Sequence, residues 1–307
     1  MDHSTLQIRN FSENDFSALG DFHKQVTEGR NIVFWWVGDQ ENWSNVFVAV
    51  EQGIMVAKGQ VQTMAVLPSE AEPSAKHRIF FNIKTLPERE KDQVLLKEMY
   101  NAIHRRALEL KKDFPSARGT ELCFGNFVEE VDNTTFFAGL PAFYPLKRQY
   151  RMECELSKSP RTEPTLPAPY EWQMFDTLND AQMNDYLALD TEIWPNSPTG
   201  EKRIREYMQN RNWRLLQIHH EGQPVASLMY WLAEDTIGEI EEVLVREPYR
   251  RKGLASMLLN KALHDLQAYS CEFAELDVEA TNESALKLYV SAGFQVETEE
   301  HRYATEL

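Results

Sequence analysis

A short basic stretch in the C-terminal half of this chain lies between an apolar segment and a helical pattern. The chain as a whole has a net charge of −16, yet four basic residues fall within seven positions: Arg246, Arg250, Arg251 and Lys252. Gly253 and the small residue Ala255 follow directly. Backbone N–H groups at a strand-to-helix turn have no intrahelical partner, and the helix dipole adds positive potential, so this stretch suits a phosphate group. A side chain at position 253 would hold the anion away from those N–H groups.

Three glutamates precede the basic stretch on the same apolar segment. Strand alternation predicts that Glu239 and Glu241 share a face with Val243, whereas Glu242 lies on the opposite face. A carboxylate here could accept a proton from an amine, which attacks a carbonyl only when neutral and has an ordinary pKa of about 10. The alternative is that these glutamates are cross-strand charges on a solvated sheet face.

The surrounding residues predict alternating strands and helices. Strand 239–245 leads into a helix over 255–269, which carries apolar residues at helical spacing: Ala255, Leu258, Leu259, Ala262, Leu263 and Leu266. A strand over 273–278, a short helix from about Ser284 and a last strand ending near Ala304 follow. We expect an α/β (α+β) fold with a mixed, mostly antiparallel sheet flanked by helices.

The same pattern occurs twice along the chain. Gly53 and Gly222 each lie between two apolar segments at a constant offset of 169 residues, and each predicts a β-hairpin. A proline-rich segment, 157–169, separates the copies and is expected to be an extended linker. The expected domains are therefore 1–156 and 170–307. In the first, strands are expected at 79–84, 121–127 and 147–156, with a helix over 91–111.

The stretch Arg250-x-x-Gly253-x-Ala255 after an apolar strand resembles the acyl-CoA pyrophosphate loop of the GNAT acetyltransferases. The resemblance implies two tandem GNAT-like domains, of which the second, 170–307, uses acetyl-CoA as co-substrate, with no metal. It assigns the pantetheine arm to the strand backbone at Val243, Leu244 and Val245. It assigns the pyrophosphate to the following turn: Arg250, Arg251, Lys252, Gly253, Leu254, Ala255 and Ser256.

A second GNAT-like signature begins at Asn282 and ends at Gly293-Phe294. By resemblance, Tyr289 protonates the departing coenzyme A sulfur, and Asn282 contacts the pantetheine; the alternatives are a packed helix tyrosine and an N-cap alone. In relatives that use a strand glutamate as the base, counting back from Arg250 leads to Glu239. We therefore favour Glu239 as the base, with Glu241 second.

The equivalent N-terminal loop lacks these features. No glycine occurs between Gln60 and Arg118, and the acidic residues Glu88, Glu90 and Asp92 would repel phosphate. The segment 133–139 retains a faint second signature, with Phe at the tyrosine position. This half is expected not to bind acyl-CoA, and the layout is similar to that of mycothiol synthase and its relatives.

The expected function is N-acetylation of a primary amine on a small-molecule acceptor, by direct attack in a ternary complex; the alternative is a non-catalytic acyl-CoA-binding regulator. The acidic net charge argues against nucleic acid and membrane surfaces as partners. We find no signal peptide and no apolar run of about 18 residues. Three scattered cysteines predict a reducing, cytoplasmic location. The pair His219-His220 is expected at the surface, and the oligomeric state stays open.

Overall fold

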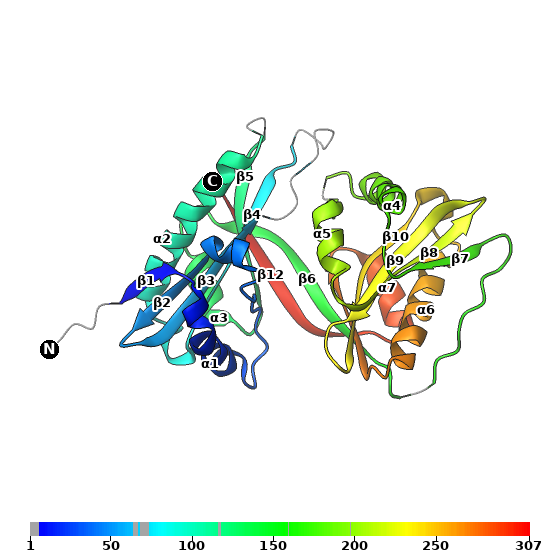
Figure 1. The fold of residues 1–307 in the computed structure, drawn as a ribbon. Coiled ribbons are helices and arrows are strands. Elements are labelled where there is room, and N and C mark those ends of the chain that lie inside the picture. Colours follow the sequence, from blue (N-terminus) through cyan, green and yellow to red (C-terminus); the bar gives the residue numbers. More distant parts are fainter. Residues whose placement is uncertain (1–5, 64–66, 68–73, 116–117, 159, 197) are drawn as a thin grey trace. The chain divides into compact units, whose positions relative to one another are not determined.

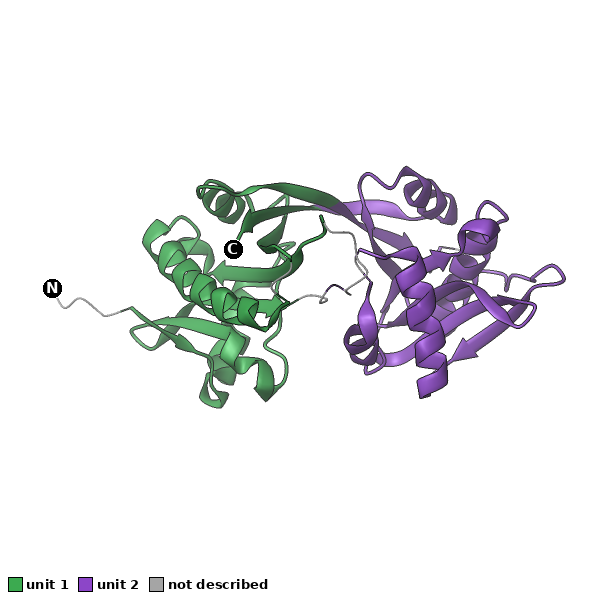
Figure 2. Ribbon diagram, turned by 90° about the horizontal axis from the view of Figure 1, so that it is seen from above, with its two compact units in different colours: residues 1–66, 73–148, 300–307 green, residues 67–72, 149–299 purple. Residues whose placement is uncertain are grey.

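A computed structural model describes residues 6–307, except for 64–66, 68–73, 116–117, 159 and 197 (Figure 1). The chain divides into two compact units (Figure 2). Unit 1 takes in most of residues 1–148 together with 300–307, and unit 2 contains residues 149–299. Each unit has its own hydrophobic cores, and the strands of each unit are consecutive in the sheet order.

The sheet of unit 1 is antiparallel except where its fourth and fifth strands pair in parallel. Its strand order is β1 (Gln7–Asn10), β2 (Val46–Glu51), β3 (Ile54–Thr63), β4 (His77–Thr85), β5 (Thr120–Phe127) and β12 (Gln295–Glu306). Its helices are α1 (Phe16–Thr27), α2 (Gln93–Leu110) and α3 (Val131–Ala138), with short 3₁₀ turns η1 (Glu13–Asp15), η2 (Gln40–Asn45), η3 (Pro87–Arg89) and η4 (Lys111–Asp113).

The sheet of unit 2 repeats this design, and again one pair of strands is parallel. Its strand order is β6 (Tyr144–Glu155), β11 (Phe273–Glu279), β10 (Ile237–Val245), β9 (Gln223–Leu232), β8 (Arg211–His220) and β7 (Glu171–Phe175). Its helices are α4 (Asp180–Ile193), α5 (Gly200–Tyr207), α6 (Leu254–Ala268) and α7 (Glu283–Ala292), with the 3₁₀ turn η5 (Glu247–Tyr249).

Both predicted hairpins are confirmed, and the same backbone geometry closes them. Gln52 and Gly53 have φ angles of 52° and 82°, and Glu221 and Gly222 have 52° and 76°. Two successive residues with positive φ make a type I′ turn, whose twist matches that of the flanking strands. The mixed α/β fold predicted for the chain is therefore present in both units.

The predicted helix after the basic stretch is also confirmed, with α6 running from Leu254 to Ala268. Its buried face packs on one side of the unit 2 sheet, in a core that includes Ile240 and Leu276. Helices α4 and α5 cover a second core that contains Tyr186, Trp213 and Leu244. Strand β10 therefore lies between two helical layers, one on each face.

Two strands, β12 and β6, pair with strands outside the sequence range expected for their own domain. The last strand, β12, pairs with β5 of unit 1, and β6 pairs with β11 of unit 2. Burial explains the partners, since Ala304 packs with Cys123 of β5, whereas Met152 and Cys154 belong to the α6 core. The alternating sequence of an antiparallel strand does not specify which sheet receives it.

The proline-rich segment 157–169 lies along unit 2. The backbone N–H of Arg161 donates to Gln267 Oε1 at 2.8 Å, and Lys261 Nζ is 2.7 Å from Glu163 Oε1. Leu166 packs against the α6 core. In its described residues the segment is thus held against α6. Across the described chain, we find no helix with the length and apolar composition to span a membrane.

Candidate functional site

Strands β10 and β11 separate partway along their length. Their parallel pairing covers only Ile237, Gly238 and Glu239, whereas β11 continues to pair with β6 as far as Glu279. The backbone of β10 from Ile240 onward therefore has no ladder partner on the β11 side. Unpaired backbone groups must be satisfied by water, side chains or a ligand. Val243, Leu244 and Val245, the residues predicted to bind pantetheine, all lie in this opening.

A β-bulge in β10 changes which side chains share a face. The pairing with β9 shifts register between Glu241 and Leu244, and Glu242 has a φ of 55°. Val243 consequently packs in the α6 core and Leu244 in the α4–α5 core. The expectation that Glu242 lies opposite Glu241 is wrong, because the extra residue of a bulge reverses the alternation after it. Glu242 instead faces α5, where Thr199 donates to it at 2.8 Å.

The predicted pyrophosphate loop forms the turn between β10 and α6. Arg251 has a φ of 59° and Gly253 a φ of 82°, and α6 begins directly afterward without a side-chain cap. No atom lies within 4 Å of the position that a Cβ at Gly253 would take, so the turn is open there. Its uncapped N–H groups are available to an anion.

The other residues of this loop differ in their side-chain contacts and in their exposure to solvent. Arg250 Nε donates to Val245 O at 3.1 Å and holds the turn to the end of β10. Lys252 lies over the Tyr249 ring at 5.0 Å. Leu254 is buried in the α6 core, so only its backbone can face a ligand, and Ala255 and Ser256 are partly exposed. Binding of acyl-CoA by these residues stays a prediction.

Asn282 caps α7. Its Oδ1 accepts a hydrogen bond from Ala285 N at 3.1 Å. An N-cap of this kind contributes about 1 kcal/mol to helix stability. This geometry accounts for the residue type, and contact with pantetheine stays a prediction.

Glu239 is held by an arginine that sequence reasoning missed. Both carboxylate oxygens bind the Arg151 guanidinium of β6, at 2.7 and 2.6 Å, and the residue is only 7% exposed. Burial raises the pKa of Glu239 to about 7, while Arg151 acts against that rise. Arg151 also lies 2.5 Å from Glu275. No local pattern pointed to it, because 88 residues separate Arg151 from Glu239.

Glu241 differs from Glu239 in having no partner. Within the described part of the chain, no hydrogen bond or ion pair involves its carboxylate, which is partly buried. Burial raises its pKa to about 8, and the charges of Glu242 and Glu239 act in the same direction. An unpaired carboxyl group with such a pKa is suited to accept a proton near neutral pH.

Tyr289 lies on α7 and is 8% exposed. Its ring packs edge-on against Phe294, at 6.0 Å between centroids. Burial raises the pKa of its phenol, and the charges of Glu241 and Glu242 raise it further. The phenol therefore stays protonated and can donate a proton.

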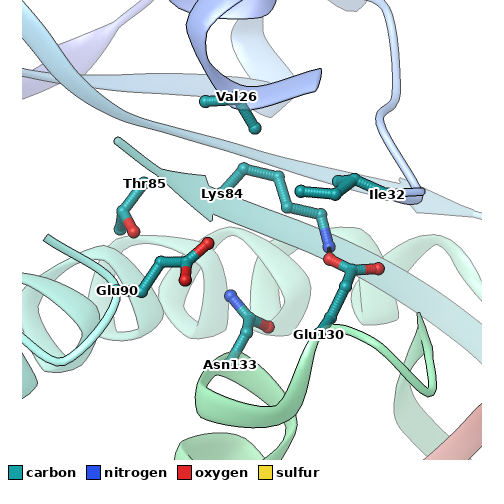
Figure 3. A pocket seen from close by; sticks show the side chains of 7 residues that line it. All are labelled: Val26, Ile32, Lys84, Thr85, Glu90, Glu130 and Asn133. Carbon is teal, nitrogen blue, oxygen red and sulfur yellow. Dashed lines mark hydrogen bonds and ion pairs between the residues drawn. The ribbon is translucent and has the colours of Figure 1, made fainter. Parts of the chain in front are cut away.

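The counterpart opening in unit 1 is filled (Figure 3). Pairing of β4 with β5 ends at Phe81, but the Lys84 ammonium beyond it binds Glu130 and lies 2.9 Å from Asn126 Oδ1. Asn133 Nδ2 donates to the freed carbonyl of Ile83 at 2.9 Å. The remaining cavity has a volume of about 10 Å³ and is lined by Val26, Ile32, Lys84, Thr85, Glu90, Glu130 and Asn133.

The start of α2 is also occupied by a side chain. Asp92 accepts a hydrogen bond from Leu95 N at 2.9 Å, so its carboxylate takes the place that an anion would need. Glu90, just before it, pairs with Arg30 at 2.5 Å. The corresponding end of α6 has Gly253 and no such cap.

The histidine pair of β8 and the three cysteines are further residues that the sequence singled out. His219 is 8% exposed and bonded to Gln217, so its expected surface position is wrong; the inward face of β8 buries it. The cysteines Cys123, Cys154 and Cys271 are free and buried. No group of His, Cys, Asp or Glu among the described residues has the arrangement of a metal site.

Comparison with known proteins identifies the domain that carries this site. The family described as "Acetyltransferase (GNAT) family" matches residues 173–294. N-alpha-acetyltransferase 30 of Xenopus laevis is 39% identical over 66 residues, covering 22% of this chain and 24% of the relative. Mycothiol acetyltransferase of Corynebacterium diphtheriae is 40% identical over 65 residues, covering 21% and 22%. The chain thus spans about a quarter of each of these relatives.

Solved structures resemble the whole chain. A GCN5-related N-acetyltransferase from Sphaerobacter thermophilus matches with a TM-score of 0.71 at 16% identity, covering 98% of this chain and 95% of that one. A tandem GNAT protein from the clavulanic acid biosynthesis pathway matches with a TM-score of 0.69 at 13% identity, covering 98% of both. These likenesses show a shared tandem fold, and the GNAT acetyltransferase family model matches residues 173–294 within it.

Proposed function

We propose that unit 2 binds acetyl-CoA along β10 and transfers its acetyl group to a primary amine of a small-molecule acceptor. The opening between β10 and β11, which ends at the uncapped, glycine-started helix α6, is the observation that carries this proposal. It is supported by the membership of residues 173–294 in an acetyltransferase family and by relatives that are themselves named acetyltransferases.

The residues of this unit fit the two polar parts of acetyl-CoA. The free backbone groups at Val243 and Val245 can pair with the pantetheine amides as a further strand would. The N–H groups from Gly253 to Ser256 can bind the pyrophosphate, with Arg250, Arg251 and Lys252 supplying positive charge. Asn282 is proposed to contact the pantetheine arm.

Glu241 is the proposed base, in preference to Glu239. A carboxylate that already accepts two charge-assisted hydrogen bonds from Arg151 gives up that interaction when it is protonated, whereas Glu241 has no such partner. Glu241 takes a proton from the acceptor ammonium, and the neutral nitrogen attacks the thioester carbonyl carbon. As the C–S bond breaks, Tyr289 donates its proton to the sulfur, and the second proton that the nitrogen loses as the amide forms restores the phenol. The products are an amide and free coenzyme A.

Unit 1 is proposed to have lost acyl-CoA binding. Its opening holds the buried Lys84–Glu130 pair, and Asp92 caps the helix where phosphate would bind. One acetyl-CoA site per chain follows. The chain is proposed to act in the cytoplasm without a metal.

The competing function is that of an acyl-CoA-binding regulator without catalysis. The decisive experiment incubates the protein with acetyl-CoA and a panel of amines while free thiol is followed. The panel includes a short peptide with a free N-terminus, because the name of the N-alpha-acetyltransferase relatives suggests that acceptor. Amine-dependent thiol release supports the enzyme. Tight coenzyme A binding with no release from any amine would favour the regulator.

A further inference from the structure

The face of β10 that α4 and α5 cover carries three carboxylates that have no ion-pair partner among the described residues. Glu241, Glu242 and Asp190 all lie on the face covered by α4 and α5, and Asp190 is fully buried. Within the described residues, none of the three forms an ion pair. The Arg203 charge acts against the rise in the pKa of Glu241 and Glu242, but its guanidinium lies over the Tyr207 ring, 4.9 Å from the centroid, and forms no ion pair with either. Buried charges are costly unless an opposite charge is present.

One hydroxyl joins two of these carboxylates. Thr199 Oγ1 lies 2.8 Å from Glu242 Oε1 and 3.2 Å from Asp190 Oδ1. A threonine hydroxyl has a single proton and can donate to only one of them. Asp190 Oδ2 accepts from Gly200 N at 3.2 Å, but the contact between Thr199 Oγ1 and whichever carboxylate it does not donate to still needs a proton from another donor or a cation.

A buried tyrosine provides an independent indication of a ligand. Tyr186 is 0% exposed, and its hydroxyl has no hydrogen-bond partner in the described structure. It precedes Asp190 by one turn on α4, so both side chains lie on the same face of the helix. Burial raises the pKa of its phenol, and the charges of Glu242 and Asp190 act in the same direction. A buried hydroxyl without a partner is destabilising, and a ligand that supplies the partner removes that cost.

We infer that the acceptor carries a second positive charge, which binds Glu242 and Asp190 while the reacting amine lies at Glu241. The acceptor class is an aliphatic diamine or polyamine. Glu241 and Glu242 are adjacent in the bulge and on the same face, so a flexible diamine can reach both. This inference depends on the proposed acetyl transfer and goes further by naming the acceptor.

The test compares putrescine with n-butylamine, which has the same carbon chain and one amine fewer. The ratio of their kcat/KM values should favour putrescine about 10- to 100-fold, because charge-assisted hydrogen bonds hold the second ammonium. Glu242→Gln should bring that ratio close to parity. Asp190→Asn provides a second route to the same result, and thermal melting confirms that each variant is folded.

The matched control is Glu201→Gln. Glu201 lies on α5 near Thr199, is exposed and pairs with Arg205, so this change removes the same charge without altering the buried group. It should leave the ratio unchanged. Equal kcat/KM for both amines in the wild type, or a preference that survives both Glu242→Gln and Asp190→Asn, would overturn the inference.

A binding measurement separates this inference from the function itself. If no amine is acetylated, the proposed transfer fails. Calorimetry of putrescine with the coenzyme A-loaded protein then still decides the acceptor question. Binding that Glu242→Gln weakens at least about tenfold supports a diamine site. Binding equal to that of n-butylamine, or none, refutes it.

Discussion

The openings of the two units are built from the same strands but hold different contents. In unit 2, β10 leaves β11 after Glu239, and the helix beyond begins at Gly253 without a cap. In unit 1, β4 leaves β5 after Phe81, yet Lys84, Glu130 and Asn133 fill the space. Separated strands alone therefore do not make a ligand site. Their freed backbone groups must also be left unpaired by the protein.

The two units also differ in what the N–H groups at the start of each helix bind. In unit 1 the carboxylate of Asp92 accepts from the first turn of α2. The first turn of α6 has no side-chain acceptor. The same orphan N–H groups are therefore used for stability in one unit and left for an anion in the other. Each of the following experiments alters one side of this contrast.

Gly253→Glu should have the largest effect, because the loss of coenzyme A binding abolishes acetyl transfer altogether. The new carboxylate lies where the pyrophosphate is proposed to bind, and losing two charge-assisted hydrogen bonds costs about 100-fold or more in affinity. Calorimetry measures the affinity. Gly222→Glu is the matched control, because Gly222 also has a positive φ with no atom within 4 Å of the added Cβ. Unchanged binding in a folded Gly253→Glu protein would refute the loop assignment.

Glu241→Gln should lower kcat about 10²–10⁴-fold, as expected when a general base is removed. The wild-type kcat should rise as pH increases through about 8, because only the deprotonated carboxylate can accept a proton. The variant should lack this inflection. Steady-state rates at saturating amine check both points.

Glu239→Gln is the companion to that experiment. It weakens the Arg151 pair and should cost less in kcat than Glu241→Gln while keeping the inflection. A larger loss for Glu239→Gln, with the inflection gone, would return the role of base to Glu239.

Lys84→Met should destabilise unit 1 by about 3–5 kcal/mol, because it leaves Glu130 as an unpaired buried charge. Coenzyme A affinity should stay at its wild-type value, since the altered opening is not the proposed site. Denaturant unfolding and calorimetry measure the two quantities. A large change in coenzyme A affinity would show that unit 1 takes part in binding.

Coenzyme A at a hundredfold excess over its Kd should stabilise the protein by about 2.7 kcal/mol, with a stoichiometry of one per chain. The single site follows from the filled opening in unit 1. Titration calorimetry gives the stoichiometry directly. Two equivalent sites per chain would remove the contrast between the units.

Tyr289→Phe should have the smallest effect, a fall in kcat of about tens-fold, at the low end of the range for general acids. The thiolate is a fairly good leaving group, and the ring that packs against Phe294 is retained. Coenzyme A affinity should change little. A variant with full kcat would make Tyr289 a packing residue.

Local patterns predicted much of this protein. The two hairpins follow from Gly53 and Gly222, α6 follows from its apolar periodicity, and the turn at Gly253 follows from glycine between a strand and a helix. These features depend on residues a few positions apart, whose backbone hydrogen bonds and side-chain spacing are set by local geometry.

Only the tertiary structure decided the remaining features. It paired Arg151 with Glu239 across 88 residues and thereby left Glu241 as the carboxylate without a partner. It placed β12 beside β5, and it introduced the bulge that turns Glu242 toward Thr199. Partners far apart in sequence are chosen by burial and packing in three dimensions, and a bulge reverses strand alternation without any change in the apolar pattern.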